Sequence, residues 1–319
     1  MLSRSWARLR SWLGGRLPRW GNVIGSGDTA GANRRRVLLV TDSTACLSEP
    51  LAAELGITVV PLQLRIGDRA TNETTASGGA VAEALRSRVP VSTSQPAPRA
   101  FYQAYQDARL AGAQAVVSVH LSRELSGTCD SARTAAAESG VDVRVIDSGM
   151  LAMGLGYAVI AAAEVARAGG TVEEVVAAVE ARRASTSILV YVDTLEYLRR
   201  GGRIGAARAL LGSALAIKPL LQVVEGRIEP LEKVRTASRA IARLEEIAVE
   251  RAGDQRVDLA VHHLGAPERA ITLSRRLRAR IPAVNACHVT EVGAVIGAHV
   301  GPGMLAVVIS PCGERAAQS

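Results

Sequence analysis

Short apolar runs alternate with amphipathic segments through the first half of this 319-residue chain, and polar side chains follow the runs. The runs that begin at Val37, Ile57, Ala115 and Val141 have the composition and length of buried strands. Strands separated by helices form right-handed parallel units, and their ligand crevice lies beyond the carboxyl ends of the strands. This pattern predicts an α/β fold whose N-terminal domain, residues 37–168, contains a doubly wound parallel sheet.

Polar residues are concentrated at the ends of these predicted strands. The segment Thr41–Thr44 follows the first run, and Asp147-Ser148 follows the last one. Because a parallel sheet brings its carboxyl ends to one edge, we expect Asp42 and Ser43 to lie at a ligand crevice.

Two clusters of hydroxyl side chains belong to the same half of the chain. The first contains Thr93 and Ser94, and the second contains Ser122 and Ser126 just before Thr128. We predict that each cluster forms a turn in front of a helix, where free backbone N–H groups and the helix dipole favour an anion. The two turns together would bind a small anionic head group.

The second half of the chain has a different pattern. Gly169-Gly170 marks the predicted domain boundary, and the second domain is expected to cover residues 169–312. Predicted strands and helices alternate there as well, but two of the strands are joined by a tight turn at Glu225-Gly226. Hairpin-linked strands mixed with helices predict an α+β layer, not a second parallel sheet.

Residues 1–36 differ in composition from the rest of the chain. Trp and Leu side chains recur there at steps of three and four residues, with arginines between them, which is typical of a basic amphipathic helix. One interpretation is weak contact with an anionic membrane surface through residues 1–20. The competing interpretation is a flexible extension, or residues upstream of the true start codon.

The net charge of +8 is also concentrated in this extension. Residues 1–36 contain eight arginines and one aspartate, so the remaining residues are close to neutral. The aromatic content is only 3%, which disfavours base stacking. We therefore expect no nucleic-acid partner, and a nucleic-acid regulator would depend on the extension alone.

Four widely separated cysteines, without a CxxC pair, are typical of reduced thiols in a cytoplasmic protein. No spacing of cysteine or histidine predicts a metal site, and adjacent His262 and His263 point to opposite faces of a strand. His120 lies in an apolar run and is expected to be a core histidine with satisfied hydrogen bonds. No apolar run is long enough for a membrane span, and the N-terminus lacks the apolar core of a secretory signal.

Common catalytic motifs are absent from the sequence. It contains neither a Walker A loop nor the GxSxG motif of a nucleophile elbow. Three other positions are candidates for a site: His299 in the glycine-rich segment 297–303, Arg203 after a Gly-Gly pair, and Arg235 before Thr236.

Taken together, these motifs resemble the DegV family of fatty acid-binding proteins, over about residues 36–310. The matching segments occur in order and are Thr41–Thr44, Val60–Leu62, Thr93–Pro96, Leu121-Ser122, Ser126–Thr128, Asp147-Ser148, Thr194–Leu198, Gly201–Ile204, Lys218-Pro219, Lys233–Thr236 and Gly301–Gly303. Cys129 and the segment 67–79 depart from the usual pattern of that family. These differences bear on the preferred acyl chain length and on the identity of the partner, not on the fold.

The resemblance implies a two-domain protein that encloses one long-chain fatty acid between its domains, has no cofactor and is not an enzyme. It implies that the carboxylate is bound by hydroxyl groups of the two clusters, here Thr93, Ser94, Ser126 and Ser122. Arg203, Arg235 and His299 match positions near the head group or on a surface that faces a fatty acid kinase.

The leading hypothesis is therefore a carrier that presents an acyl carboxylate to a fatty acid kinase, which makes acyl phosphate for phospholipid synthesis. The alternative is a hydrolase or phosphotransferase that acts on an acyl substrate through Ser126 or His299.

Overall fold

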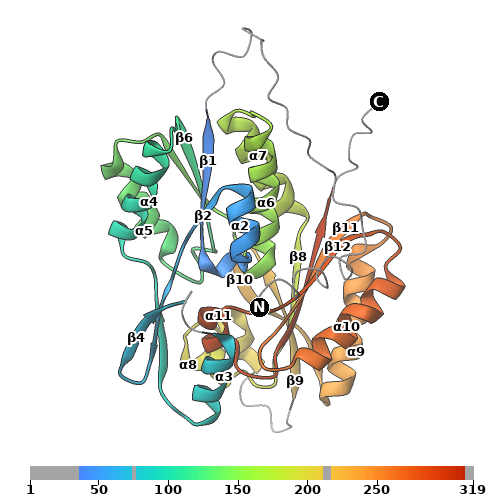
Figure 1. Ribbon diagram of the computed structural model, residues 1–319. Coiled ribbons are helices and arrows are strands. Elements are labelled where there is room, and N and C mark those ends of the chain that lie inside the picture. The colour runs from blue at the N-terminus through green and yellow to red at the C-terminus, as the bar shows by residue number, and fades with distance from the viewer. Residues whose placement is uncertain (1–35, 74–76, 211–216, 313–319) are drawn as a thin grey trace, which may run out of the picture. The chain divides into compact units, whose positions relative to one another are not determined.

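The computed structural model describes residues 36–73, 77–210 and 217–312 (Figure 1), all of which belong to the unit Arg34–Ser319. The amphipathic helix and the membrane contact predicted for residues 1–20 lie outside the described residues. Within the described part of the chain, each helix is too short or too polar to cross a membrane.

Four parallel strands form the first sheet, in the order β2-β1-β6-β7. The strands are β1 (Val37–Asp42), β2 (Ile57–Val60), β6 (Ala115–His120) and β7 (Val143–Asp147). The helices around it are α2 (Glu49–Leu55), α4 (Pro98–Leu110), α5 (Thr128–Ser139), α6 (Ala152–Arg167) and α7 (Val172–Ser185). Apolar residues of α4 and α5 pack on one face, and those of α6 and α7 pack on the other. The predicted doubly wound sheet is confirmed.

A small antiparallel sheet, in the order β4-β3-β5, follows the first βαβ unit. It consists of β3 (Gln63–Ile66), β4 (Arg69–Asn72) and β5 (Val91–Ser94), and helix α3 (Gly78–Arg86) connects β4 to β5. The apolar run that begins at Ile57 is interrupted at Pro61, which cannot donate to a strand ladder, so β2 ends at Val60 and a separate strand, β3, follows in another sheet.

The prediction of a turn at Thr93-Ser94 is also wrong. In β5, Val91 and Thr93 are half-buried while Ser92 and Ser94 are exposed, which is the two-residue period of a strand with one covered face. Pairing with β3 satisfies the backbone groups along one side of β5. The second hydroxyl cluster does precede a helix, since α5 begins at Thr128.

The second half of the chain forms a six-stranded sheet in the order β10-β9-β8-β13-β11-β12. All neighbours are antiparallel except β11 and β12. The strands are β8 (Ser187–Tyr191), β9 (Lys218–Val224), β10 (Arg227–Val234), β11 (Val257–His263), β12 (Val284–Glu291) and β13 (Leu305–Pro311). β9 and β10 form the predicted hairpin, with positive φ angles of 47° at Glu225 and 80° at Gly226. The α+β layer is confirmed.

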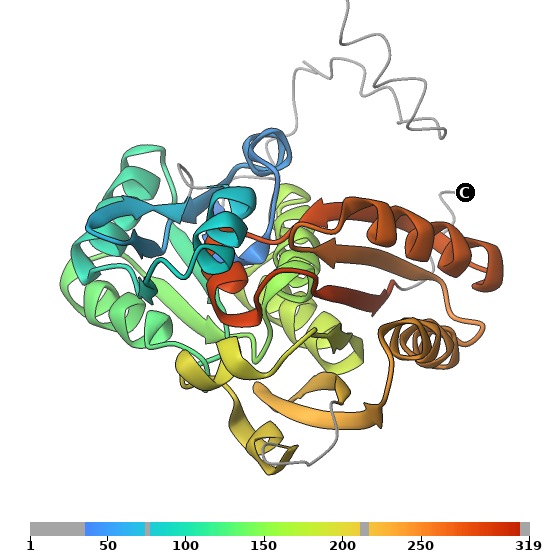
Figure 2. The same cartoon turned by 90° about the horizontal axis from the view of Figure 1, so that it is seen from below.

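Helices cover both faces of the six-stranded sheet. α9 (Ala237–Ala252) and α10 (Pro267–Arg280) pack on the face directed away from the four-stranded sheet, as Figure 2 shows. α6 and α7 lie between the two sheets, and one core joins their apolar residues to Leu39 of β1 and Val308 of β13 (Figure 1). The predicted division between residues 37–168 and 169–312 stays a prediction.

Four short elements complete the described fold around one end of these sheets. They are η1 (Ser43–Ala45), α8 (Glu196–Arg200), η3 (Gly205–Leu210) and α11 (Ala294–Val300).

Candidate functional site

A cavity of about 320 Å³ lies where the carboxyl end of β1 meets elements of both larger sheets. Its wall is built from η1, the end of β5, the β6–α5 loop, α8, β10 and α11. This volume lies within the usual range of small-molecule sites, about 300–1,000 Å³. The cavity therefore combines residues that are more than 200 positions apart in the chain.

Five of the predicted site residues line this cavity: Thr93, Ser94, Ser126, Arg203 and His299. Thr93 Oγ1 lies 2.8 Å from His299 Nε2, and Ser126 Oγ lies 2.9 Å from the hydroxyl oxygen of Thr128. The side chain of Arg203 donates to two backbone carbonyls and is held beside His299. One end of the cavity is therefore polar and rich in hydroxyl groups.

Ser122 and Arg235 lie outside the cavity wall. The hydroxyl of Ser122 is fully buried and donates to the carbonyl oxygen of Gly226 at 2.7 Å, which ties the β6–α5 loop to the β9–β10 hairpin. Arg235 is exposed beyond the end of β10. The roles predicted for these residues at a carboxylate or a kinase surface stay predictions.

The imidazole of His299 is neutral at physiological pH. Burial, and secondarily the charge of Arg203, lower its pKa to about 4. Its Nδ1 is buried without a hydrogen-bond partner among the described residues, and it faces the α-carbon of Gly201, where a Cβ would collide with it. We place the ring hydrogen on Nε2, because a lone pair tolerates a C–H neighbour and an N–H group does not.

This tautomer determines the direction of the hydrogen bond between His299 and Thr93. Nε2–H donates to Thr93 Oγ1, so the hydroxyl hydrogen of Thr93 is available to a ligand in the cavity. An anion at the polar end would be bound by a hydroxyl donor whose orientation the imidazole controls.

A second, apolar cavity of about 30 Å³ lies next to the first. The two share Leu151, Leu198, Ile228, Ile296 and Val300. Beyond these residues the second cavity is lined by apolar side chains of β8, β9 and β13, with Gln222 as its polar residue. The combined space is a hydroxyl-rich chamber with a narrow apolar extension.

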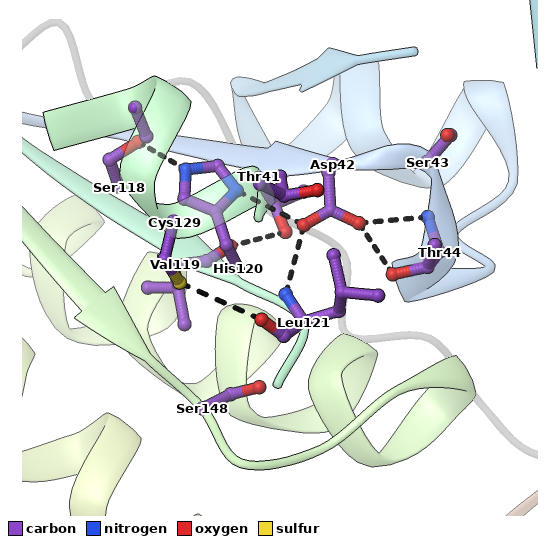
Figure 3. Close-up of polar contacts among 12 residues, drawn as sticks. Thr41, Asp42, Ser43, Thr44, Ser118, Val119, His120, Leu121, Cys129 and Ser148 are labelled. Carbon is purple, nitrogen blue, oxygen red and sulfur yellow. Dashed lines mark hydrogen bonds and ion pairs between the residues drawn. The ribbon is translucent and has the colours of Figure 1, made fainter. Parts of the chain in front are cut away.

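Below the cavity wall, a buried hydrogen-bond network joins the carboxyl ends of β1 and β6 (Figure 3). His120 Nδ1 lies 3.0 Å from Asp42 Oδ2, and His120 Nε2 lies 2.7 Å from Ser118 Oγ. Asp42 also accepts bonds from the backbone N–H groups of Thr44 and Leu121, both of which line the cavity. The network therefore holds Thr44 and Leu121 of the cavity wall in place from the side opposite the cavity.

The order Ser-His-Asp in this network is that of a hydrolase triad, but its surroundings are different. Ser118, His120 and Asp42 have no exposed surface, none of them lines the cavity, and Ser118 Oγ also contacts the hydroxyl of Tyr105. A nucleophile must reach its substrate, so we interpret this network as structural. The prediction for His120 as a satisfied core histidine is confirmed. Neither Asp42 nor Ser43 lines the cavity, so the prediction that these two residues lie at the crevice is wrong.

Several lining residues have no distinguishing signal in the sequence. The apolar residues Val295, Ile296 and Val300 of α11 have the pattern of ordinary core residues. Gln95 could have been found, because it belongs to a motif already identified; it lines the cavity and donates to Ser131 at 3.0 Å. Among the described residues there is no group of three or more potential metal ligands.

The model of the family described as "Uncharacterised protein, DegV family" matches residues 36–312. A DegV domain-containing protein of Streptomyces coelicolor is 61% identical over 277 residues, which cover 86% of this chain and 99% of that protein.

Solved structures show the same fold. A DegV family protein from Thermus thermophilus, described by its fatty acid binding, is 34% identical with a TM-score of 0.83 over 87% of this chain and 100% of that chain. DegV from Bacillus subtilis, described as a fatty acid binding protein, is 30% identical with a TM-score of 0.81 and the same coverage.

Proposed function

The chain belongs to the DegV family, and on this basis we propose that it is a long-chain fatty acid-binding carrier, not itself an enzyme, which presents the acyl carboxylate to a fatty acid kinase. The observation that carries the proposal is that a hydroxyl-rich chamber and a narrow apolar extension lie side by side and share five apolar lining residues. An amphipathic ligand with a small polar head and a long apolar tail matches that shape.

Hydroxyl groups can bind a carboxylate and still leave it able to react with a donor on a partner enzyme. Thr93, Ser94 and Ser126 can donate hydrogen bonds to a carboxylate without neutralising its charge. Arg203 donates to the carbonyl oxygens of Leu125 and Gly201, so its charge lies beside the head-group chamber while its hydrogen bonds go to the backbone. The carboxylate therefore stays a nucleophile for a phosphorylated donor on the partner enzyme.

The tail explains why such a carrier would need a partner. Transfer of each methylene from water is worth ~0.8 kcal/mol, so about fifteen methylenes contribute on the order of 12 kcal/mol before ordering costs. Release into water is correspondingly slow. A kinase that acts on the head group while the tail stays bound avoids this barrier.

Several finer features belong to the same proposal. We place the protein in the cytoplasm and assign it no cofactor, with acyl phosphate for phospholipid synthesis as the product of its partner. Arg203, Arg235 and His299 are the residues proposed to lie near the head group or to face the kinase. We also propose weak membrane-surface contact through residues 1–20, to be tested by vesicle co-sedimentation of the full chain against a chain that starts at Arg36.

The proposal is tested by native mass spectrometry of the full chain as purified, followed by lipid extraction. The expected result is a mass excess equal to one long-chain fatty acid, which is released on denaturation. Protein that carries no fatty acid, and takes none up on incubation with palmitate, would contradict the proposal.

A further inference from the structure

Glu73 is a buried carboxyl group that the proposed ligand site does not use. It follows β4, its residue exposure is 6%, and it does not line the cavity. Carboxyl groups are seldom buried unless a cation pairs with them. Nevertheless, the ion pairs within residues 36–73, 77–210 and 217–312 include none with Glu73.

The two oxygens of Glu73 contact different parts of the fold. Oε1 accepts a hydrogen bond of 2.7 Å from the backbone N–H of Val295, in the first turn of α11. Oε2 accepts a hydrogen bond from the hydroxyl of Ser43, which in turn accepts one of 2.9 Å from the backbone N–H of Leu62. One carboxyl group thus joins α11, η1 and the segment after β2.

The residue at position 293 shows how closely this carboxyl group approaches α11. Gly293 precedes the first residue of the helix, and a Cβ at this position would collide with Glu73 Oε1. Glu73 can therefore approach α11 this closely only because residue 293 is glycine. A small core formed by Leu64, Val81 and Ala294 lies in the same contact between α11 and the β3–β5 region.

The elements joined by Glu73 are also elements of the cavity wall. Thr44 and Leu62 lie next to the Ser43 end of the contact, and α11 contributes Val295 and His299. A seven-residue helix cannot hold its own conformation in water, so its position depends on tertiary contacts. His299 lies one turn beyond Val295, and its hydrogen bond to Thr93 depends on where α11 sits.

We propose that Glu73 is a positioning residue, a clasp that holds α11 against the carboxyl end of β1 and so fixes the wall that carries His299. The part of this inference that concerns ligand retention rests on the proposed fatty acid function; the part that concerns α11 does not. Burial raises the pKa of Glu73, and both the ionised and the neutral carboxyl can make the two contacts.

Three variants separate a positioning role from a general contribution to stability. Glu73→Ala removes both contacts, whereas Glu73→Gln keeps an acceptor for Val295 and a donor for Ser43. Glu245→Ala is the matched control, because Glu245 is 7% exposed, lies on α9 and pairs with Arg276 and Arg280 of α10, away from the cavity wall.

The first experiment measures hydrogen exchange in the full chain after removal of bound lipid. We expect the α11 amides of Gly297 and Gly301 to exchange at least about tenfold faster in Glu73→Ala than in the wild type, because a hydrogen bond to a carboxylate is lost. In Glu73→Gln these amides are expected to exchange at nearly the wild-type rate. Unchanged exchange in Glu73→Ala, or an equal increase in Glu245→Ala, would overturn the clasp. If Glu73→Ala does not fold, Ser43→Ala is compared with Glu245→Ala instead. It removes one of the two contacts of Glu73, together with the acceptor of the Leu62 N–H group, and α11 exchange that is unchanged or equally raised in both variants would overturn the clasp.

The second experiment measures release of cis-parinaric acid by stopped-flow fluorescence. Release is expected to be at least about tenfold faster from Glu73→Ala and unchanged from Glu245→Ala. Equal release from both variants would refute the ligand part of the inference. If the wild type takes up no probe, the fatty acid function fails, and the exchange experiment still decides whether Glu73 holds α11.

Discussion

At the scale of single residues, the polar end of the cavity depends on which atom donates each hydrogen. We assign His299 as the donor to Thr93, because its buried Nδ1 faces an α-carbon where an N–H group would not fit. Thr93 is thereby left with a hydroxyl hydrogen for the ligand. Neither the pKa nor the tautomer of His299 can be inferred from the sequence, since both depend on Gly201 and Arg203.

Replacing Thr93 by valine keeps the shape of the side chain and removes its hydroxyl. We expect the affinity for a long-chain fatty acid to fall about tenfold or more, because a hydrogen bond to a charged group is lost. Ser126→Ala is expected to act in the same direction. Displacement of a fluorescent fatty acid measures the effect. Ser92→Ala, at an exposed position of the same strand, is the control, and equal affinities for Thr93→Val and Ser92→Ala would contradict the assignment.

His262 predicts how stability responds to acid. It is fully buried, its Nε2 accepts a bond of 3.3 Å from the N–H of Met153, and burial lowers its pKa to about 4. Between pH 6.5 and 4 the unfolded chain binds a proton at this position and the folded chain does not, so stability falls as the pH decreases. The contribution is on the order of 3 kcal/mol.

Urea unfolding as a function of pH tests the contribution of His262. In His262→Gln the unfolding free energy is expected to fall less steeply between pH 6.5 and 4 than in the wild type. The difference in slope corresponds to the uptake of about one proton on unfolding. The comparison uses the slope, so a lower overall stability of the variant does not affect it. Parallel slopes would show that His262 does not titrate in this interval.

At the scale of secondary-structure elements, the regular sheets could be predicted and the small one could not. The run Val37–Val40 is apolar throughout, as expected of a central parallel strand, and β1 begins at Val37. The sequence of β5, Val-Ser-Thr-Ser, is mostly polar and is followed by Pro96, so it has the composition of a turn. Only its pairing with β3 makes it a strand.

The candidate site also contains some features that the sequence predicts and others that it does not. Its hydroxyl groups are recognisable because they are grouped in motifs. The role of Glu73 is not, because it depends on a contact with Val295, 222 residues away in the sequence. α11 itself is short and apolar, and no local signal distinguishes its cavity-facing residues from the core.

Strand β13 forms part of the apolar extension, and one position on it should control chain length. Ala306 is buried and lines the narrow cavity, opposite Val190 of β8. Ala306→Val adds two methyl groups there. We expect the lipids that co-purify to shift toward shorter chains, as measured by mass spectrometry of the extract. Thr93→Val is the contrast, since it should weaken binding of all chain lengths alike; an unchanged lipid profile in Ala306→Val would place the tail elsewhere.

At the scale of the whole molecule, the cavity lies where β1, β5, β10 and α11 meet, so a head group bound there contacts both halves of the chain. In the proposed function, this arrangement would separate the residues that bind the tail from those that bind the head group. Apolar side chains of the six-stranded sheet form one side of the extension, whereas the hydroxyl groups that line the chamber come from the first half of the chain.

Arg203 tests this separation of roles. We expect Arg203→Ala to bind fatty acid with an affinity close to that of the wild type but to support less acyl phosphate formation by the cognate kinase. Its guanidinium donates to backbone carbonyls, so the variant leaves the proposed carboxylate ligands in place. Acyl phosphate is measured with radiolabelled ATP in the reconstituted pair. An equal loss of binding and of product would assign Arg203 to the head-group site instead of the kinase surface.

The most direct test of the central claim is a crystal structure of the full chain loaded with palmitate. We predict that the carboxylate lies within hydrogen-bonding distance of Thr93 Oγ1 and Ser126 Oγ, and that the tail passes Leu151 and Ile296 toward Ala306. A carboxylate bound away from these hydroxyl groups, or a tail outside the apolar extension, would contradict it.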